Sequence, residues 1–259
     1  MTGALVFVLG ACIGSFLNVL ADRLPAGRSI VHPPSHCEAC GRRLTPLELI
    51  PILSYLLLRG RCRTCRAPIP RRVLLLELAT AVAFWLLYLK YGVSLRLVIL
   101  AFYFSLFLTI AVIDLEHKLI LNRLVYPASP LALALCTFYP LGLAEGRAPL
   151  SSFLFSLLGG AICFLILLLP ALIWREGMGW GDVKLAGLIG LALGFPGGLV
   201  ALGLGIVAAG VPAIFLLALR IKGRHDSLPF GPFLAAGVLA TLIWGQFIVD
   251  WYLRLFTWT

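Results

Sequence analysis

The chain has 259 residues, of which 61% are hydrophobic and only 12% are charged, and its mean hydropathy is +1.03. Soluble domains are nearer to half apolar and a quarter charged, so this composition excludes an ordinary soluble protein and indicates one that crosses a membrane several times. The formal net charge is +10. We expect no nucleic-acid partner despite this charge, because most of the chain would lie in lipid.

The first apolar run covers residues 2–20, which is enough for one membrane crossing of roughly 20 residues. A cleaved signal peptide and a lipoprotein processing site at residues 9–12 are the two alternatives. Both require a basic stretch ahead of the apolar run, and the sequence has none. We therefore predict a retained first transmembrane helix.

A polar segment, residues 21–72, follows and contains ten arginines. The seven later apolar runs cover residues 73–89, 94–113, 124–143, 151–173, 183–197, 199–219 and 229–252. The sequence thus predicts an all-α, polytopic membrane protein with about eight transmembrane helices. Its predicted parts are a first helix (1–20), a cytoplasmic segment (21–72) and a seven-helix core (73–259).

The distribution of positive charge predicts the orientation of these spans. With eight spans and a cytoplasmic polar segment, 17 of the 21 Lys and Arg residues fall on the cytoplasmic side. Short cytoplasmic loops carry such an excess in membrane proteins. We therefore expect both termini on the non-cytoplasmic side.

Four cysteines of the polar segment form two Cys-x-x-Cys pairs, Cys37 with Cys40 and Cys62 with Cys65. Four thiolates at this spacing are typical of a tetrahedral, structural zinc site, and a cytoplasmic location disfavours disulfides. His36 is a conceivable substitute ligand, but four cysteines already complete the site. The other three cysteines, Cys12, Cys136 and Cys163, are expected to be small buried residues.

Two aspartates occupy equivalent places at membrane boundaries. Asp114 ends the third apolar run, while Asp182 follows Gly179 and Gly181 and precedes the sixth run. The predicted topology places both at the cytoplasmic face. Two carboxylates that lie close together share a proton, so one acts as a base for water and the other as an acid for a carbonyl oxygen. The pattern therefore predicts an aspartic peptidase.

Structural explanations compete with this hypothesis. Asp182 is well placed to cap the helix that it begins, with Lys184 as a nearby partner. Asp114 is harder to explain in this way, because a negative charge near a helix C-terminus is unfavourable. Glu116 is an alternative for the first acid.

The chain also resembles, along nearly its whole length, the type IV prepilin peptidases, or leader peptidases, of bacterial pilus and type II secretion systems. The resemblance rests on Gly14–Val19, Asp22–Pro25, Pro33–Gly41, Glu48–Tyr55, Arg59–Cys65, Gly177–Leu185 and Pro229–Ala235. These motifs are specific only in combination.

The resemblance implies two activities, in the bacterial inner membrane. The first is cleavage of the basic leader from prepilins or pseudopilins, with Asp114 and Asp182 matching the two catalytic aspartates. The second is N-methylation of the new N-terminus with S-adenosylmethionine, for which Glu48 matches an acidic position and is the candidate cofactor-binding residue. Leu121 stands where the family usually has proline, which predicts a softer turn after Asp114. Leu49 stands where the family often has asparagine, which weakens the methylation assignment.

Three other functions remain open at this point. One is a membrane aspartyl peptidase without methylation or with another substrate. Another is an ion-coupled transporter that uses Asp114 and Asp182, which predicts acids near the bilayer midplane and interrupted helices. The third is a scaffold that uses the zinc segment as an adaptor, and it leaves the paired acids unexplained.

Overall fold

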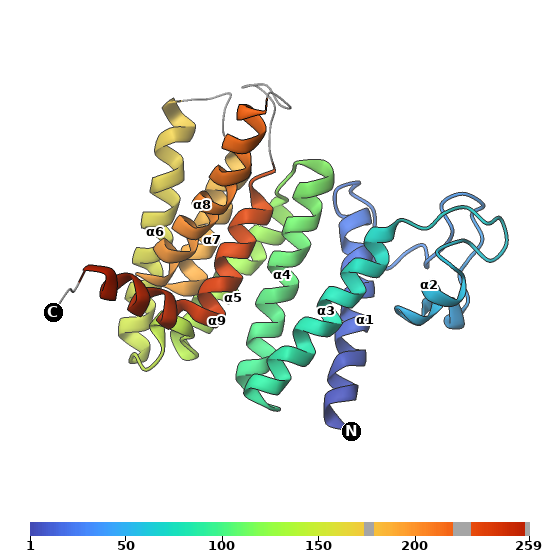
Figure 1. The fold of residues 1–259 in the computed structure, drawn as a ribbon, viewed down its shortest axis with the longest axis horizontal. Coiled ribbons are helices and arrows are strands. Elements are labelled where there is room, and N and C mark those ends of the chain that lie inside the picture. Colours follow the sequence, from blue (N-terminus) through green and yellow to red (C-terminus); the bar gives the residue numbers. More distant parts are fainter. Residues whose placement is uncertain (174–178, 220–228, 257–259) are drawn as a thin grey trace. The chain divides into compact units, whose positions relative to one another are not determined.

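A computed structural model describes residues 1–173, 179–219 and 229–256. Over these residues the chain forms nine α-helices and two short 3₁₀ helices, traced in Figure 1. In chain order they are α1 (Thr2–Arg23), η1 (Pro46–Leu49), α2 (Leu53–Leu57), α3 (Arg71–Tyr91), α4 (Leu95–His117), α5 (Asn122–Phe138), η2 (Gly142–Ala144), α6 (Pro149–Ile173), α7 (Trp180–Leu193), α8 (Gly197–Ala218) and α9 (Gly231–Phe256). Residues 21–72 contain only η1, α2 and the ends of α1 and α3, as expected for a small polar segment.

Every predicted apolar run is a helix. Six of the described helices, α1, α3, α4, α6, α8 and α9, are long and apolar enough to cross a membrane. The remaining two apolar runs form α5 and α7, which have 17 and 14 residues. At about 1.5 Å per residue, α7 is roughly 21 Å long, which is less than the hydrocarbon core of about 30 Å. The all-helical, multi-pass architecture is confirmed, while the count of eight crossings stays a prediction.

The chain divides into two compact units, Met1–Thr109 and Ile110–Thr259. In the first unit, α1 packs tightly on α3. A Cβ at Gly14 would lie 2.7 Å from the Cα of Glu77, and one at Gly10 would lie 2.8 Å from the Cα of Ala81. Small residues allow helices to approach this closely in membranes. The division into residues 1–20, 21–72 and 73–259 is a separate prediction and remains one.

Glu77 is a buried acid within α3 that the sequence analysis did not single out. Glu77 is only 4% exposed, and its Oε2 accepts the N–H of Ile52 at 2.7 Å. Ile52 has a φ of 62° and precedes α2, so this bond holds a strained turn of the polar segment. A carboxylate inside a predicted membrane helix was the signal available in the sequence.

In the second unit, the short helix α7 is the central element, since it contacts α5, α6, α8 and α9. Val183, Leu185 and Ile189 of α7 are fully buried. A Cβ on Gly190 would lie 2.2 Å from the carbonyl oxygen of Gly159 in α6, so the two backbones touch. A helix that is apolar on all sides is expected to be enclosed by others in this way.

Two of the three cysteines outside the polar segment are buried, as expected, and the third is exposed. Cys136 and Cys163 are buried, as predicted. Cys12 is exposed on α1, so its prediction as a buried residue is wrong. The apolar run that contains Cys12 would face lipid as readily as protein, and hydropathy does not distinguish the two.

Candidate functional site

Asp114 lies in the last turn of α4 and is 5% exposed. Its Oδ2 accepts the backbone N–H of Gly231, the first residue of α9, at 2.8 Å. The N-terminus of a helix carries partial positive charge and unpaired N–H groups, so a carboxylate is favourable there. The expected conflict between Asp114 and the C-terminus of its own helix is therefore offset by the start of another helix.

Asp182 lies in the first turn of α7, ahead of the predicted crossing at 183–197. The N-cap is Gly179, so the expectation that Asp182 caps the helix itself is wrong by three residues. Asp182 donates its own N–H to the carbonyl of Gly179 at 3.1 Å, and its carboxylate accepts the N–H of Gly179. Burial and, second, the negative charge of Asp114 together raise the pKa of Asp182 to about 6. The two acids therefore lie within electrostatic range of each other.

The neighbouring charged residues do not pair with Asp182 among the described ion pairs. Lys184 donates to the side-chain oxygen of Asn122 at 3.0 Å and lies over the ring of Tyr126. The expected ion pair between Lys184 and Asp182 is thus absent from the described part of the chain. Glu116, the alternative first acid, is exposed, whereas Asp114 is buried.

The turn after Asp114 does not depend on proline. Leu121, at the position where the family usually has proline, is the N-cap of α5 and has a φ of −78°. Proline fixes φ near −65°, so Leu121 adopts a backbone conformation close to that of the residue it replaces. Gly181 packs closely against this turn, since a Cβ added at Gly181 would lie 2.8 Å from the Cβ of Ile120. Gly177 and Met178 of the same glycine-rich motif lie outside the described residues.

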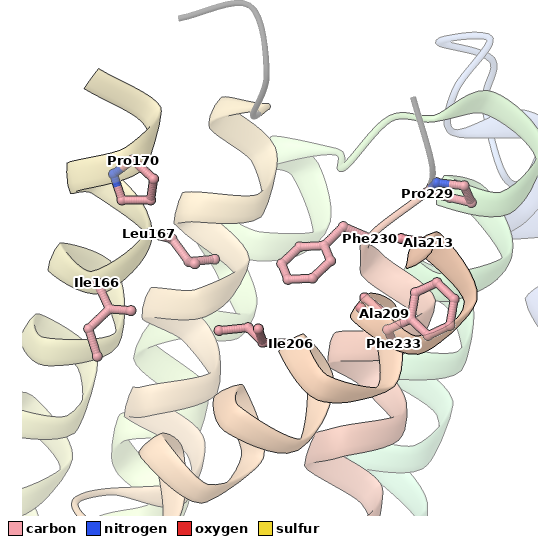
Figure 2. A pocket seen from close by; sticks show the side chains of 10 residues that line it. Ile166, Leu167, Pro170, Ile206, Ala209, Ala213, Pro229, Phe230 and Phe233 are labelled. Carbon is pink, nitrogen blue, oxygen red and sulfur yellow. The ribbon is translucent and has the colours of Figure 1, made fainter. Parts of the chain in front are cut away.

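An apolar groove opens near Asp114 in the second unit. It has a volume of about 450 Å³ and lies between α6, α8 and the start of α9. Its lining consists of Ile166, Leu167, Pro170, Ile206, Ala209, Gly210, Ala213, Pro229, Phe230 and Phe233. Figure 2 shows the ring of Phe230 pointing into this groove. Phe230 lines the groove, and the next residue in the chain, Gly231, donates its N–H to Asp114. The groove therefore ends next to the residue that contacts this acid.

The two Cys-x-x-Cys pairs of the first unit form matching turns. The N–H of Cys37 donates to the carbonyl of Arg42, and the N–H of Cys62 donates to the carbonyl of Ala67, both at 2.9 Å. The fifth residue of each turn has positive φ, 68° at Gly41 and 58° at Arg66. A non-glycine residue is strained there, so the second turn is less favourable than the first.

The four sulfur atoms converge on one point. The Sγ atoms of Cys37, Cys40, Cys62 and Cys65 all lie within 4.8 Å of one another, and those of Cys37 and Cys65 are 3.7 Å apart. Tetrahedral zinc with Zn–S bonds of about 2.3 Å requires sulfur atoms about 3.8 Å apart. The donor set and its spacing therefore fit a structural zinc ion. His36 is not part of this cluster, and its Nδ1 lies 3.0 Å from the carbonyl oxygen of Pro34.

Each turn also stabilises thiolate, the form that binds metal. The N–H groups of Cys40 and Ala39 lower the pKa of Cys37. Those of Cys65 and Thr64 lower the pKa of Cys62 to about 6. The backbone N–H groups of each turn thus favour the thiolate form of the first cysteine of the pair.

Glu48 lies between the two cysteine turns, at the end of a network within the polar segment. Its Oε1 accepts from Arg42, and its Oε2 accepts from the N–H of Thr45 at 2.9 Å and from the hydroxyl of Thr45 at 2.8 Å. These contacts, the one with Arg42 foremost, lower the pKa of Glu48 to about 2. Glu48 therefore closes a capping box at the start of η1.

Glu48→Gln is expected to loosen the polar segment in a pH-dependent way. The pKa of Glu48 is about 2 in the folded protein and about 4.5 for the free group. The carboxylate therefore stabilises the folded segment above about pH 4.5, and this contribution is lost as the pH falls toward about 2. Amide hydrogen exchange of Thr45 in the two proteins should differ clearly near about pH 7 and converge only at about pH 2 or below, where the carboxylate is protonated in the folded protein as well. A difference that is the same at both pH values would contradict this assignment.

The chain matches two protein-family models and is similar in sequence to several known proteins. Residues 8–91 match the bacterial peptidase A24 N-terminal domain, and residues 100–214 match the type IV leader peptidase family. A Bacillus subtilis protein named prepilin leader peptidase/N-methyltransferase is 35% identical over 256 residues, covering 97% of this chain and 98% of that protein. A Pseudomonas aeruginosa protein of the same name is 31% identical over 277 residues, covering 95% of this chain and 92% of that protein. No solved structure matches.

Proposed function

Because the chain belongs to the type IV leader peptidase family, we propose that it cleaves the basic leader from prepilins or pseudopilins and N-methylates the new N-terminus. The observation that supports the proposal is that the two predicted aspartates lie in one unit within electrostatic range of each other, each accepting the N–H of a glycine at the start of a helix. None of the described residues favours a transporter or a scaffold over this function.

The proposed cleavage uses the two carboxylates with one shared proton. The ionised carboxylate takes a proton from water, whose oxygen then bonds to the carbon of the scissile peptide. The protonated carboxylate gives its proton to the carbonyl oxygen of that peptide. The resulting tetrahedral intermediate loses its C–N bond, and a proton passes to the departing amine. The raised pKa of Asp182, about 6, brings protonation of the pair closer to neutral pH than the ordinary pKa of an aspartate would.

The proposed methylation rests on the names of the relatives. S-adenosylmethionine would supply a methyl group bonded to a sulfonium, and the new N-terminal amine would accept it as a neutral nucleophile. We propose Glu48 as the residue of this segment that serves the cofactor in methylation. Its bonds from Arg42 and Thr45 hold its carboxylate in place between the two cysteine turns.

We further propose a structural zinc ion on Cys37, Cys40, Cys62 and Cys65, which fits the observed sulfur spacing. The proposed location is the bacterial inner membrane, with the polar segment in the cytoplasm and both termini on the opposite side. The partners are then the bilayer and the apolar prepilin segment, whose leader lies on the cytoplasmic side.

Mass spectrometry of the reaction products tests both activities together. The purified protein in detergent is incubated with a prepilin and S-adenosylmethionine, and the new N-terminus is examined. Cleavage on the cytoplasmic side of the apolar segment, with a gain of one methyl group on the new amine, is expected. Cleavage without a methyl group would reject the methyltransferase half of the proposal, and no cleavage would reject the peptidase half.

A further inference from the structure

The start of α9 contributes one backbone group to the candidate active site. A helix leaves its first four N–H groups without partners in the helix. In α9 the N–H groups of Phe233 and Leu234 turn back to the carbonyl of Phe230, at 3.1 and 3.2 Å, and Pro232 has no N–H. The N–H of Gly231 is thus the one directed outward, and it points to Oδ2 of Asp114 at 2.8 Å.

The contact leaves no space for a side chain at position 231. A Cβ there would lie 2.9 Å from Oδ2, 3.1 Å from Cβ and 3.2 Å from Cγ of Asp114. Separations near 3.0 Å or below require a neighbour to move, and here the nearest neighbours all belong to Asp114. The φ of Gly231 is not positive, so glycine is required by the nearness of Asp114 and not by the backbone conformation.

Gly179 offers a parallel on the other acid. Its N–H donates to the carboxylate of Asp182, and a Cβ on it would lie 3.1 Å from Oδ2 of Asp182. Each acid therefore has a glycine at the start of a helix pressed against it. The glycine for Asp182 lies three residues away in sequence, whereas the glycine for Asp114 lies 117 residues away.

We propose that Gly231 is a positioning residue for the cleavage reaction, holding Oδ2 of Asp114 with its N–H and leaving Oδ1 as the oxygen that exchanges the proton. This inference rests on the proposed peptidase function. Gly231 acts only through Asp114 and touches no substrate. Catalytic groups that are displaced by about 1 Å lose on the order of a hundredfold in rate, so the orientation of this carboxylate has a large kinetic effect.

Gly231→Ala is the variant that tests the proposal. Alanine keeps the N–H donor and adds only the methyl group that displaces Asp114. We expect kcat to fall at least about tenfold while KM stays within about twofold, because the orientation of the acid is lost and the substrate surface is kept. The matched control is Gly237→Ala, in the same helix, whose Cβ would lie 2.3 Å from the carbonyl oxygen of Ala201. Gly237→Ala should lower the melting temperature at least as much and kcat less.

A stability cycle tests the contact without relying on activity. Gly231→Ala is made in the wild type and in Asp114→Ala, and melting temperatures are compared. The alanine at 231 should be less destabilising when Asp114 is truncated, because the displaced side chain is gone. Equal destabilisation in both backgrounds, an unchanged kcat in Gly231→Ala, or an equal loss of kcat in Gly237→Ala would overturn the proposal. An inactive wild type would instead reject the peptidase function, and the stability cycle would still measure the contact.

Discussion

Replacing either Asp114 or Asp182 by asparagine is expected to lower the rate of prepilin cleavage at least about a thousandfold. Asparagine has the size of aspartate but cannot exchange a proton at neutral pH, so the shared proton of the pair is lost. At position 114 its amide oxygen still accepts the N–H of Gly231, the bond that aspartate makes at 2.8 Å. Both variants should therefore fold with nearly wild-type melting temperatures.

The control for these variants is Glu116→Gln, two residues from Asp114 on the same helix. Glu116 is exposed, while Asp114 is buried, so the glutamine variant should cleave at the wild-type rate. Rates are measured from the appearance of mature pilin in detergent. Near wild-type cleavage by Asp114→Asn or Asp182→Asn would make that aspartate structural. A large loss in Glu116→Gln would make Glu116 the first acid.

Cys62→Ser is expected to abolish zinc binding and to unfold the cysteine turns. Cys62 is 7% exposed and supplies one of four sulfur atoms that lie within 4.8 Å of one another. A structural zinc ion contributes on the order of 10 kcal/mol to the folding of such a segment, which has little apolar core of its own. Zinc content per chain should fall to background. Hydrogen exchange should rise at the N–H of Cys37, which binds Arg42 within the first turn, and at the N–H of Ile69, which binds Gly60 on either side of the second turn.

Cys12→Ser is the matched control, since it removes an exposed thiol far from the cluster in sequence. It should retain zinc and the exchange pattern of the wild type. Removal of metal from the wild type with a chelator should reproduce the effect of Cys62→Ser. Retention of stoichiometric zinc by Cys62→Ser, or unchanged exchange after chelation, would contradict a structural zinc site.

The helices could be predicted from the sequence, because the length and the hydropathy of an apolar run are sufficient to identify a membrane helix. The ends of the helices were less predictable. The run before Asp114 ends at residue 113, yet α4 continues to His117, since a helix does not stop where polar residues begin. Hydropathy also assigned α7 a membrane crossing, although its apolar run, residues 183–197, is short, and the helix has only 14 residues.

The sequence identified the candidate residues of the site. It did not identify the backbone groups that contact their side chains. Cysteine spacing alone indicated the cluster, since each pair is local in sequence. The bonds from Gly231 to Asp114 and from Ile52 to Glu77 join residues 117 and 25 positions apart. No local pattern encodes such contacts, because they depend on how helices pack. The signals in the sequence were a glycine between prolines and aromatics, and an acid in an apolar run.

The shortness of α7 bears on how water reaches the scissile bond. This helix is roughly 21 Å long and is packed among α6, α8 and α9, which have 25, 22 and 26 residues. It is too short to reach both surfaces of the bilayer, so the predicted crossing at this place would need non-helical chain to complete it. Such chain is tolerated within a membrane only where protein encloses it or where it lines a hydrated recess. Asp182 stands at one end of this short helix, and we expect the nucleophile to be drawn from a local inlet of solvent there.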